Sequence, residues 1–200
     1  MALTTQQQSD LISVYIAAFD RAPDADGLDF WANSIINGVN PTVTDVANAI
    51  FNDQSIAEVN ANYSDALTNE QFVTKIYQNV FNREPDAEGL AFWAGAMNSG
   101  INSRGETVVE MFKSLSNPGS EADKALFDNK VAVGEYFAIE VGSNGVALAR
   151  EALESVTEDP ASVDTAKAAI DGVDAVGENF TLTTGSDNLT GTSGNDTITG

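Results

Sequence analysis

The chain repeats itself, and this internal duplication limits the folds open to it more than any other feature. Eleven residues of the 18-residue segment that begins at Tyr15 recur 62 residues later, and they include both tryptophans, Trp31 and Trp93. Each copy contains the motif R-x-P-D-x-x-G-L-x-F-W. Self-similarity at a fixed period is typical of a structural unit that is used more than once. We therefore expect two copies of one unit, at about residues 6–62 and 68–124.

Apolar residues recur at intervals of three and four along most of the chain, which is the spacing of one helix face. All five prolines precede such segments, and we expect Pro23 and Pro85 in the first turn of a helix. Thr68 and Gln71 form a capping-box pattern at a further helix start. Helices are predicted at about residues 6–20, 23–37, 42–53, 55–62, 69–81, 85–98, 104–116, 120–140, 144–156 and 160–171. The predicted fold class is mainly α, with a duplicated all-helical domain over residues 1–175.

Histidine and cysteine are both absent from the 200 residues. Their absence excludes Ser-His-Asp and Cys-His nucleophiles, and it removes the usual ligands of zinc, haem and iron–sulfur clusters. Asp24 and Asp26 could in principle act as an acid and a base, but their place at a helix start favours capping. We expect a protein that is not an enzyme and whose remaining metal chemistry is that of calcium and other hard cations.

The charge balance limits the partners of the chain. Nine lysines and arginines stand against 30 aspartates and glutamates, which gives a net charge of −21. Such a chain repels the phosphates of nucleic acids, so we expect no nucleic-acid partner. No run of 18 apolar residues is present, so we expect no membrane span. The start of the chain carries no basic residue, and we expect no classical signal peptide.

The duplicated motif predicts a corner between two helices. Arg21 leads into a turn, and Asp24 then meets the positive end of the next helix dipole within reach of that arginine. Gly27 is a poor helix former, so we expect it to permit a close approach of another backbone segment. Trp31 shares the i, i+3, i+7 stripe with Leu28 and a residue one turn later. The motif therefore serves either to lock two helices together or to present an aromatic platform for a sugar ring.

This motif resembles that of a bacterial domain of unassigned function, which is common in large secreted and surface proteins. The wider arrangement is similar to the N-terminal region of Gram-negative surface-layer (S-layer) proteins. The shared features are the start without a leader, the paired copies and a third helical stretch that begins at Glu121. The resemblance implies that this region attaches a lattice of identical copies to lipopolysaccharide on the cell surface.

The composition changes from Thr181 onward, where Thr, Gly, Ser, Asn and Asp dominate with a period of nine residues. We expect a linker from about residue 172, and residues 176–200 then form the end of this linker and a new unit that starts with a strand at 179–184. The period resembles the nonapeptide of RTX (repeat-in-toxin) proteins, which implies the start of a parallel β-roll that binds calcium, an extracellular location and export by type I secretion. The candidate calcium ligands are Gly185, Asp187, Gly191, Gly194 and Asp196. Fewer than two repeats are present, so we expect further repeats beyond residue 200, and calcium binding mainly in a longer chain.

Two loops offer polar groups to a glycan. The candidate glycan-binding residues are Asn37, Asn40, Asn98, Asn102 and Arg104, although the same residues also suit ordinary turns. A charge of −21 directs the contact to neutral O-polysaccharide (the O-antigen), or to a phosphorylated core through bridging calcium. The alternative is a protein-interaction or spacer module at the head of an RTX adhesin or of a type I secreted exoenzyme.

Overall fold

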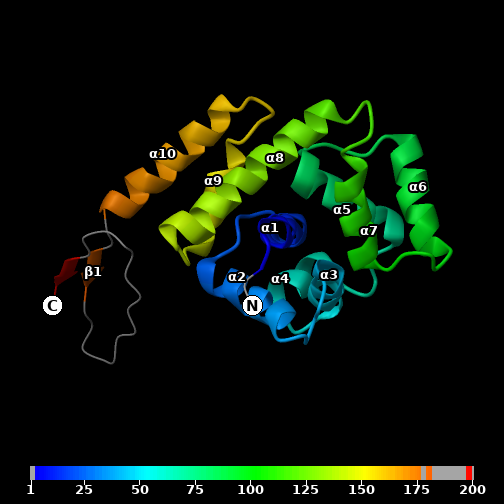
Figure 1. Ribbon diagram of the computed structural model, residues 1–200, viewed down its shortest axis with the longest axis horizontal. Coiled ribbons are helices and arrows are strands. Elements are labelled where there is room, and N and C mark those ends of the chain that lie inside the picture. The colour runs from blue at the N-terminus through cyan, green and yellow to red at the C-terminus, as the bar shows by residue number, and fades with distance from the viewer. Residues whose placement is uncertain (1–2, 177–178, 182–196, 200) are drawn as a thin grey trace.

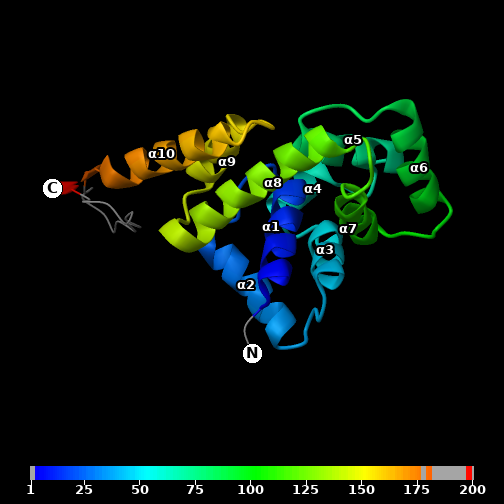
Figure 2. The ribbon, with the colours of Figure 1, turned by 45° about the horizontal axis from the view of Figure 1, so that its top comes forward.

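The computed structural model describes residues 3–176, 179–181 and 197–199 of the chain. All the regular secondary structure of the first range is helical, as Figures 1 and 2 show, and the prediction of a mainly α fold is confirmed. The helices are α1 (Thr5–Phe19), α2 (Ala25–Ile36), α3 (Val43–Asn52), α4 (Ala57–Asn62), α5 (Asn69–Phe81), α6 (Ala87–Asn98), α7 (Arg104–Ser114), α8 (Glu121–Glu135), the π-helix η1 (Tyr136–Val141), α9 (Val146–Glu154) and α10 (Ala161–Val176). Among the described residues, none of these helices is long and apolar enough to span a membrane.

The two copies of the repeat give two similar sets of helices. Helices α1, α2 and α3 form the first set, and α5, α6 and α7 form the second. Helix α3 packs against α7 more extensively than any other two described elements pack together, and α2 and α6 flank this central pair (Figures 1 and 2). The order α2, α3, α7, α6 therefore places the second helices of the two copies at opposite ends of a row.

Helix α1 lies at the centre of the core. Residues 11–19 of this helix are all buried, because α3, α5 and α8 contact it from different sides. A helix that is covered all round must be apolar all round, and Leu11, Ile12 and Ile16 are fully enclosed. A second part of the core is a cluster of aromatic rings from Phe51 and Tyr63, together with a phenylalanine of α5, whose centroids lie 5.1 to 5.6 Å apart. The core thus joins both copies into one body.

The helix that follows each corner begins later than the sequence predicts. Asp24 and Asp86 are the N-caps of α2 and α6, and their side chains accept hydrogen bonds from the amides of Gly27 (2.8 Å) and Gly89 (2.7 Å). An N-cap needs extended backbone, which Asp24 has with φ −71° and ψ 150°. The prediction that Pro23 lies in the first helical turn is therefore wrong, since it precedes the cap.

The glycine of each corner makes room for a tyrosine hydroxyl. A Cβ atom built on Gly27 would lie 2.3 Å from Oη of Tyr15, and one built on Gly89 would lie 2.9 Å from Oη of Tyr77. The prediction of a close backbone approach is therefore wrong, because the atoms nearest to each glycine belong to side chains. The indole of Trp31 lies close enough to the same Tyr15 hydroxyl to affect its pKa, and Trp93 stands in the same relation to Tyr77 in the second copy. Each corner is therefore closed by one Tyr–Gly–Trp contact.

The C-terminal part departs from the prediction at one boundary. Helix α10 continues to Val176, so the linker expected from residue 172 is still helical over its first five residues. Strands β1 (Asn179–Thr181) and β2 (Thr197–Thr199) pair in parallel, and Phe180 stands opposite Ile198. The candidate calcium ligands all fall between these strands, in residues 182–196, and lie outside the described residues.

The closeness of α3 and α7 depends on Gly105. A Cβ atom at this position would lie 2.5 Å from the backbone nitrogen of Asn48 and 2.8 Å from the backbone of Ala47. We expect Gly105→Ala to lower the free energy of unfolding by about 1–3 kcal/mol, because backbone cannot give way as a flexible side chain can. Urea unfolding followed by far-UV circular dichroism measures this loss.

Gly95 supplies the matched control for this substitution. It lies inside α6, and a Cβ atom there would meet nothing within 4 Å. Gly95→Ala is therefore expected to raise the free energy of unfolding by about 0.5–1 kcal/mol, since alanine restricts the unfolded chain and favours the helix. Two variants with effects of the same sign would contradict the close packing of α3 on α7.

Candidate functional site

A hollow of about 350 Å³ lies at the C-terminal end of α2. It contains two of the predicted glycan-binding residues, together with an aromatic pair that precedes them. Its lining residues are Phe30, Trp31, Asn33, Ser34, Asn37, Val39 and Asn40. This lining carries no charged side chain, and it combines aromatic rings, amides and one hydroxyl.

The shape of the hollow follows from how α2 ends. Gly38 has a positive φ of 72°, which turns the chain back over the helix. The backbone amides of Val39 and Asn40 then both donate to the carbonyl of Ser34, at 3.0 and 3.2 Å. The side-chain amide of Asn40 donates to the Ser34 hydroxyl at 2.7 Å. These bonds fix Asn40 and leave its carbonyl oxygen free to accept from a ligand, while the amide of Asn37 is exposed.

The aromatic part of the site is Phe30. Its side chain is 66% exposed, although it stands next to Trp31, which packs against the core. The two rings meet edge to face, with centroids 5.0 Å apart and planes at 84°. Trp31 is itself held by Tyr15 at the corner, so it supports the exposed ring from a fixed position. The site therefore presents an apolar ring face beside hydrogen-bonding amides.

Phe30 is not among the glycan-binding residues predicted from the sequence. The buried stripe of α2 contains Leu28 and Ile35, and Trp31 adjoins it. Phe30 is one residue away from Trp31, and one residue turns a helix by about 100°, so Phe30 falls outside the stripe. That offset is the signal that could have identified it as an exposed aromatic residue.

The predicted residues of the second loop are mostly engaged within the chain. The side chain of Asn98 accepts from Asn69 and donates to Glu70, both at 2.8 Å. Arg104 donates to the carbonyls of Tyr63 (2.8 Å), Ser64 (3.4 Å) and Leu67 (3.2 Å). It also lies over a buried phenylalanine ring.

The guanidinium of Arg104 closes a turn inside the fold, and its role in binding a glycan stays a prediction. Asn98 has both ends of its amide engaged in the same way. Asn102 is half-buried beside the exposed side chain of Ile101. The structure thus brings Asn37 and Asn40 together in one hollow and separates them from the other three candidates.

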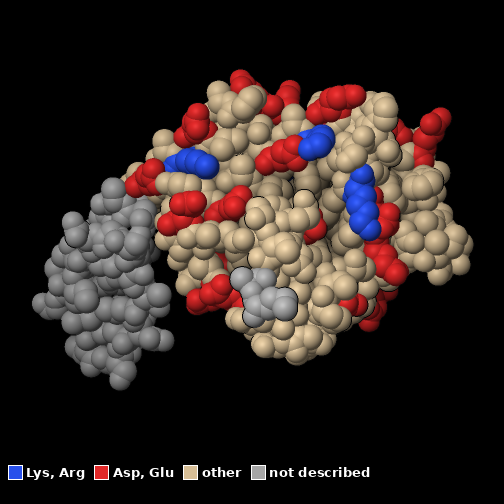
Figure 3. All heavy atoms as spheres, viewed as in Figure 1, with Lys and Arg blue, Asp and Glu red and all other residues tan. Residues whose placement is uncertain are grey.

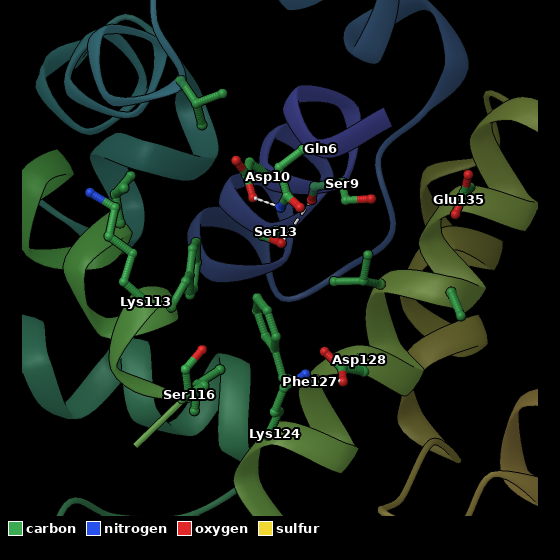
Figure 4. Close-up of a pocket in the computed structure, with 16 residues that line it drawn as sticks. Gln6, Ser9, Asp10, Ser13, Lys113, Ser116, Lys124, Phe127, Asp128 and Glu135 are labelled. Atoms are coloured by element: carbon green, nitrogen blue, oxygen red, sulfur yellow. Dashed lines mark hydrogen bonds and ion pairs between the residues drawn. The ribbon is translucent and has the colours of Figure 1, made fainter. Parts of the chain in front are cut away.

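A larger groove of about 550 Å³ lies between α1, α7 and α8, and Figure 4 shows its lining. Phe127 points into this groove and stacks on Phe112, with ring centroids 4.8 Å apart. The charges at its rim are largely engaged: Lys124 pairs with Asp128, and Lys113 pairs at 2.7 Å with a glutamate outside the groove. This groove could not be predicted from the sequence, because its walls come from segments far apart in the chain.

The surface is strongly acidic. In Figure 3 acidic side chains are spread over the visible face, and basic side chains are few. Part of the positive charge is used inside the fold, since Arg21 and Lys130 are buried. Among the residues that the structure describes, no group of three or more carboxylates is arranged to hold a metal ion. The uncharged hollow at α2 therefore stands out against an anionic surface.

Comparison with known proteins gives one match. Residues 47–120 match a family model described as a domain of unknown function (DUF4214). The matched stretch runs from α3 to the segment after α7, so it includes the second copy of the corner motif and not the first. No curated protein and no solved structure matches the chain. Over less than half of its length, the chain is thus similar to a domain family whose function is not known.

Proposed function

We propose that the helical domain is a non-enzymatic anchor, which attaches a secreted S-layer protein to the cell surface by binding the O-polysaccharide of lipopolysaccharide. One observation carries this proposal: the hollow at the end of α2 sets the exposed ring of Phe30 beside the amides of Asn37 and Asn40. Other copies of the chain are the further partners, as neighbours in the lattice.

The chemistry of the hollow suits a sugar ring. A pyranose has an apolar C–H face that packs on an aromatic ring, and hydroxyl groups that pair with amides. Phe30 offers the ring, and Asn37 offers both a donor and an acceptor. Asn40 offers an acceptor, since its amide group already donates to Ser34. A volume of about 350 Å³ is at the small end of ligand sites, which fits one or two sugar units.

Charge selects the part of lipopolysaccharide that is bound. The net charge of −21 repels the phosphorylated core, and the lining of the hollow has no cation to offset this repulsion. A neutral O-polysaccharide meets no such barrier. We therefore place the contact on the O-polysaccharide and expect it to need no calcium.

We further propose that the C-terminal segment begins an RTX β-roll that binds calcium outside the cell after type I secretion. The register of β1 and β2 supports this, because each residue stands opposite the one 18 positions later. Eighteen residues are two periods of the nonapeptide, so each strand lies beside the strand two repeats later, as in a roll with two repeats per turn. Asp187 and Asp196, which stand between the two strands in the sequence, would supply carboxylates to calcium, because all-oxygen ligands suit this ion.

The anchoring proposal predicts selective binding to smooth lipopolysaccharide. The chain is incubated with smooth lipopolysaccharide from the bacterium that encodes it, and with rough lipopolysaccharide that lacks the O-chain, each with calcium or with a chelator. We expect binding to the smooth form in both conditions and none to the rough form. Phe30→Ser is expected to weaken this binding at least about ten-fold, because the ring face is lost.

Val146→Ser is the matched control, since Val146 is also an exposed apolar residue but lies on α9, away from the hollow. It should bind as the unmodified chain does. Equal failure to bind both forms of lipopolysaccharide would refute the anchoring role. Binding that is lost with the chelator would place the contact on bridged phosphate instead of neutral sugar.

A further inference from the structure

We infer that the chain carries a second sugar contact on α6, equivalent to the hollow on α2, and that it binds one polysaccharide chain at both places. This inference rests on the proposed function and deepens it. The second contact is formed by Phe92, Ile101 and Asn102, which stand 62 residues after Phe30, Val39 and Asn40.

The two places expose the same kinds of side chain to the same extent. Phe30 is 66% exposed and Phe92 is 67% exposed, while Val39 is 75% exposed and Ile101 is 73% exposed. These four side chains are the most exposed large apolar residues in the described part of the chain. Exposed apolar side chains that gather twice at equivalent positions indicate a binding surface and not chance exposure.

The backbone geometry is also repeated. Phe92 meets Trp93 edge to face with centroids 4.9 Å apart and planes at 81°, which closely matches the pair on α2. Gly38 and Gly100 both have a φ of 72°, so the chain turns back over each helix in the same way. The amide of Ile101 donates to the carbonyl of Ala96 at 3.0 Å, as the amide of Val39 does to its counterpart.

The polar residues of the lining differ between the copies, and Gly95 and Ser99 stand where the first copy has Asn33 and Asn37. Ala96 stands where the first copy has Ser34, so Asn102 lacks the hydroxyl to which Asn40 donates. The side-chain amide of Asn102 is thus available to a ligand beside Phe92. The second contact is uncharged like the first, and both are suited to a neutral sugar.

Charge argues against a second copy of the chain as the occupant. Two copies at −21 each repel one another wherever no cation offsets their charge, and neither contact carries a basic group, so lattice neighbours would meet at other surfaces. A neutral polysaccharide meets no such electrostatic repulsion. The repetition within the ligand also matches the repetition within the protein, because successive units of one polymer can occupy two equivalent contacts.

The placement of the contacts requires a polymer. Helices α2 and α6 lie at the two ends of the row α2, α3, α7, α6 (Figures 1 and 2). With about 8–10 Å between packed helix axes, three steps along this row span on the order of 30 Å. A single sugar unit cannot touch both ends, whereas a chain of several repeats can. Linking two contacts through one ligand raises the overall affinity by about 10²–10⁴-fold.

The test compares short and long ligands. O-polysaccharide is released from the smooth lipopolysaccharide, separated by length, and titrated into the chain and into Phe30→Ser, Phe92→Ser and the double variant by calorimetry. For the shortest fragment that binds, we expect two sites per chain, one in each single variant and none in the double variant. For the long polymer, each single variant should lose about 100-fold or more in affinity. Val146→Ser serves as the control.

Failure of this inference can be told apart from failure of the proposed function. One site per chain that Phe92→Ser leaves unchanged would overturn the second contact and leave the anchoring role intact. No binding by the unmodified chain would overturn both. Analytical ultracentrifugation tests the remaining outcome, in which the exposed side chains join copies of the protein. If the chain self-associates and Phe92→Ser makes it monomeric, the inference is wrong.

Discussion

Replacement of Arg21 by alanine is expected to lower the free energy of unfolding by about 3 kcal/mol, and the same replacement of Arg83 by about 1 kcal/mol or less. The two arginines hold the same position in the two copies, but their side chains are 7% and 41% exposed. Arg21 donates to the carbonyl of Ala22 and pairs with Asp24 at 3.0 Å and with Glu58 at 3.3 Å. Its removal leaves Asp24 and the carbonyl of Ala22 without their cation at a largely buried position, whereas Glu58 keeps Arg150 at 3.4 Å.

Arg83 is the internal control for this prediction. It pairs with Asp123 of α8 and donates to the carbonyl of Glu84 at 3.0 Å, but water can replace it at each partner. Chemical unfolding of Arg21→Ala and Arg83→Ala at neutral pH, followed by far-UV circular dichroism, measures both losses. Equal losses would show that burial does not decide the contribution of this arginine.

The motif alone could not predict which arginine is buried. The first corner is covered by α9 and the segment before it, where Ala149 accepts from the amide of Ala22 at 2.9 Å and Ser143 accepts from the amide of Ala25 at 3.0 Å. These partners lie in a distant part of the sequence. The local motif is the same in both copies, so only the tertiary arrangement distinguishes them.

Features that depend on neighbouring residues were predicted well. The capping box of Thr68 with Gln71 starts α5, because each side chain bonds the backbone of the other. The predicted end of the last helix was wrong, since residues 172–176 continue α10 although a glycine stands at 172. An isolated glycine costs a helix only about 1 kcal/mol, and the packing of neighbouring residues can offset that cost.

The candidate site was predicted in part for the same reason. Asn37 and Asn40 follow a helix end, and a loop at such a place is exposed whatever the rest of the fold does. The direction of a long side chain is a tertiary property, so the sequence could not show that Arg104 turns inward to the carbonyl of Tyr63. The groove between α1, α7 and α8 also depends on the tertiary structure, so the sequence alone could not show it.

Lys130 is the second residue for which we expect a large effect, and this effect depends on pH. Its side chain is 1% exposed, and its Nζ donates to the carbonyl of Asn79 at 2.7 Å and to the side chain of Asn82 at 2.6 Å. Asn82 is the left-handed C-cap of α5, and Asp20 holds the same position at the end of α1. The ammonium group therefore lies where the ends of two equivalent helices meet, and their dipoles favour its positive charge.

Burial lowers the pKa of Lys130 to about 8, and the carboxylate of Asp20 opposes part of this lowering. In the unfolded chain the pKa of a lysine is about 10.4. Between these values the unfolded chain binds a proton that the folded chain lacks, so the free energy of unfolding rises with pH from about 8 to about 10. At about 1.4 kcal/mol for each unit of pKa difference, the rise amounts to at most about 3 kcal/mol.

The buried tyrosines set the upper limit of this rise. Burial raises the pKa of Tyr15 and of Tyr63, so the folded chain keeps protons that unfolded tyrosines lose above about pH 10. Stability should therefore fall again beyond that pH. Unfolding by urea from pH 7 to pH 11 should show a maximum near pH 10, and Lys130→Met should remove the rise while the later fall remains.

A direct titration tests the same prediction without a substitution. In the chain labelled with ¹³C at lysine Cε, the resonance of Lys130 should titrate with a midpoint near 8, well below exposed lysines at about 10.4. This measurement also decides the matter if Lys130→Met does not fold. If Lys130 instead titrates at the same pH as the exposed lysines, the two helix ends and Asp20 stabilise the ammonium group enough to cancel the effect of burial. The pH of maximum stability would then be lower.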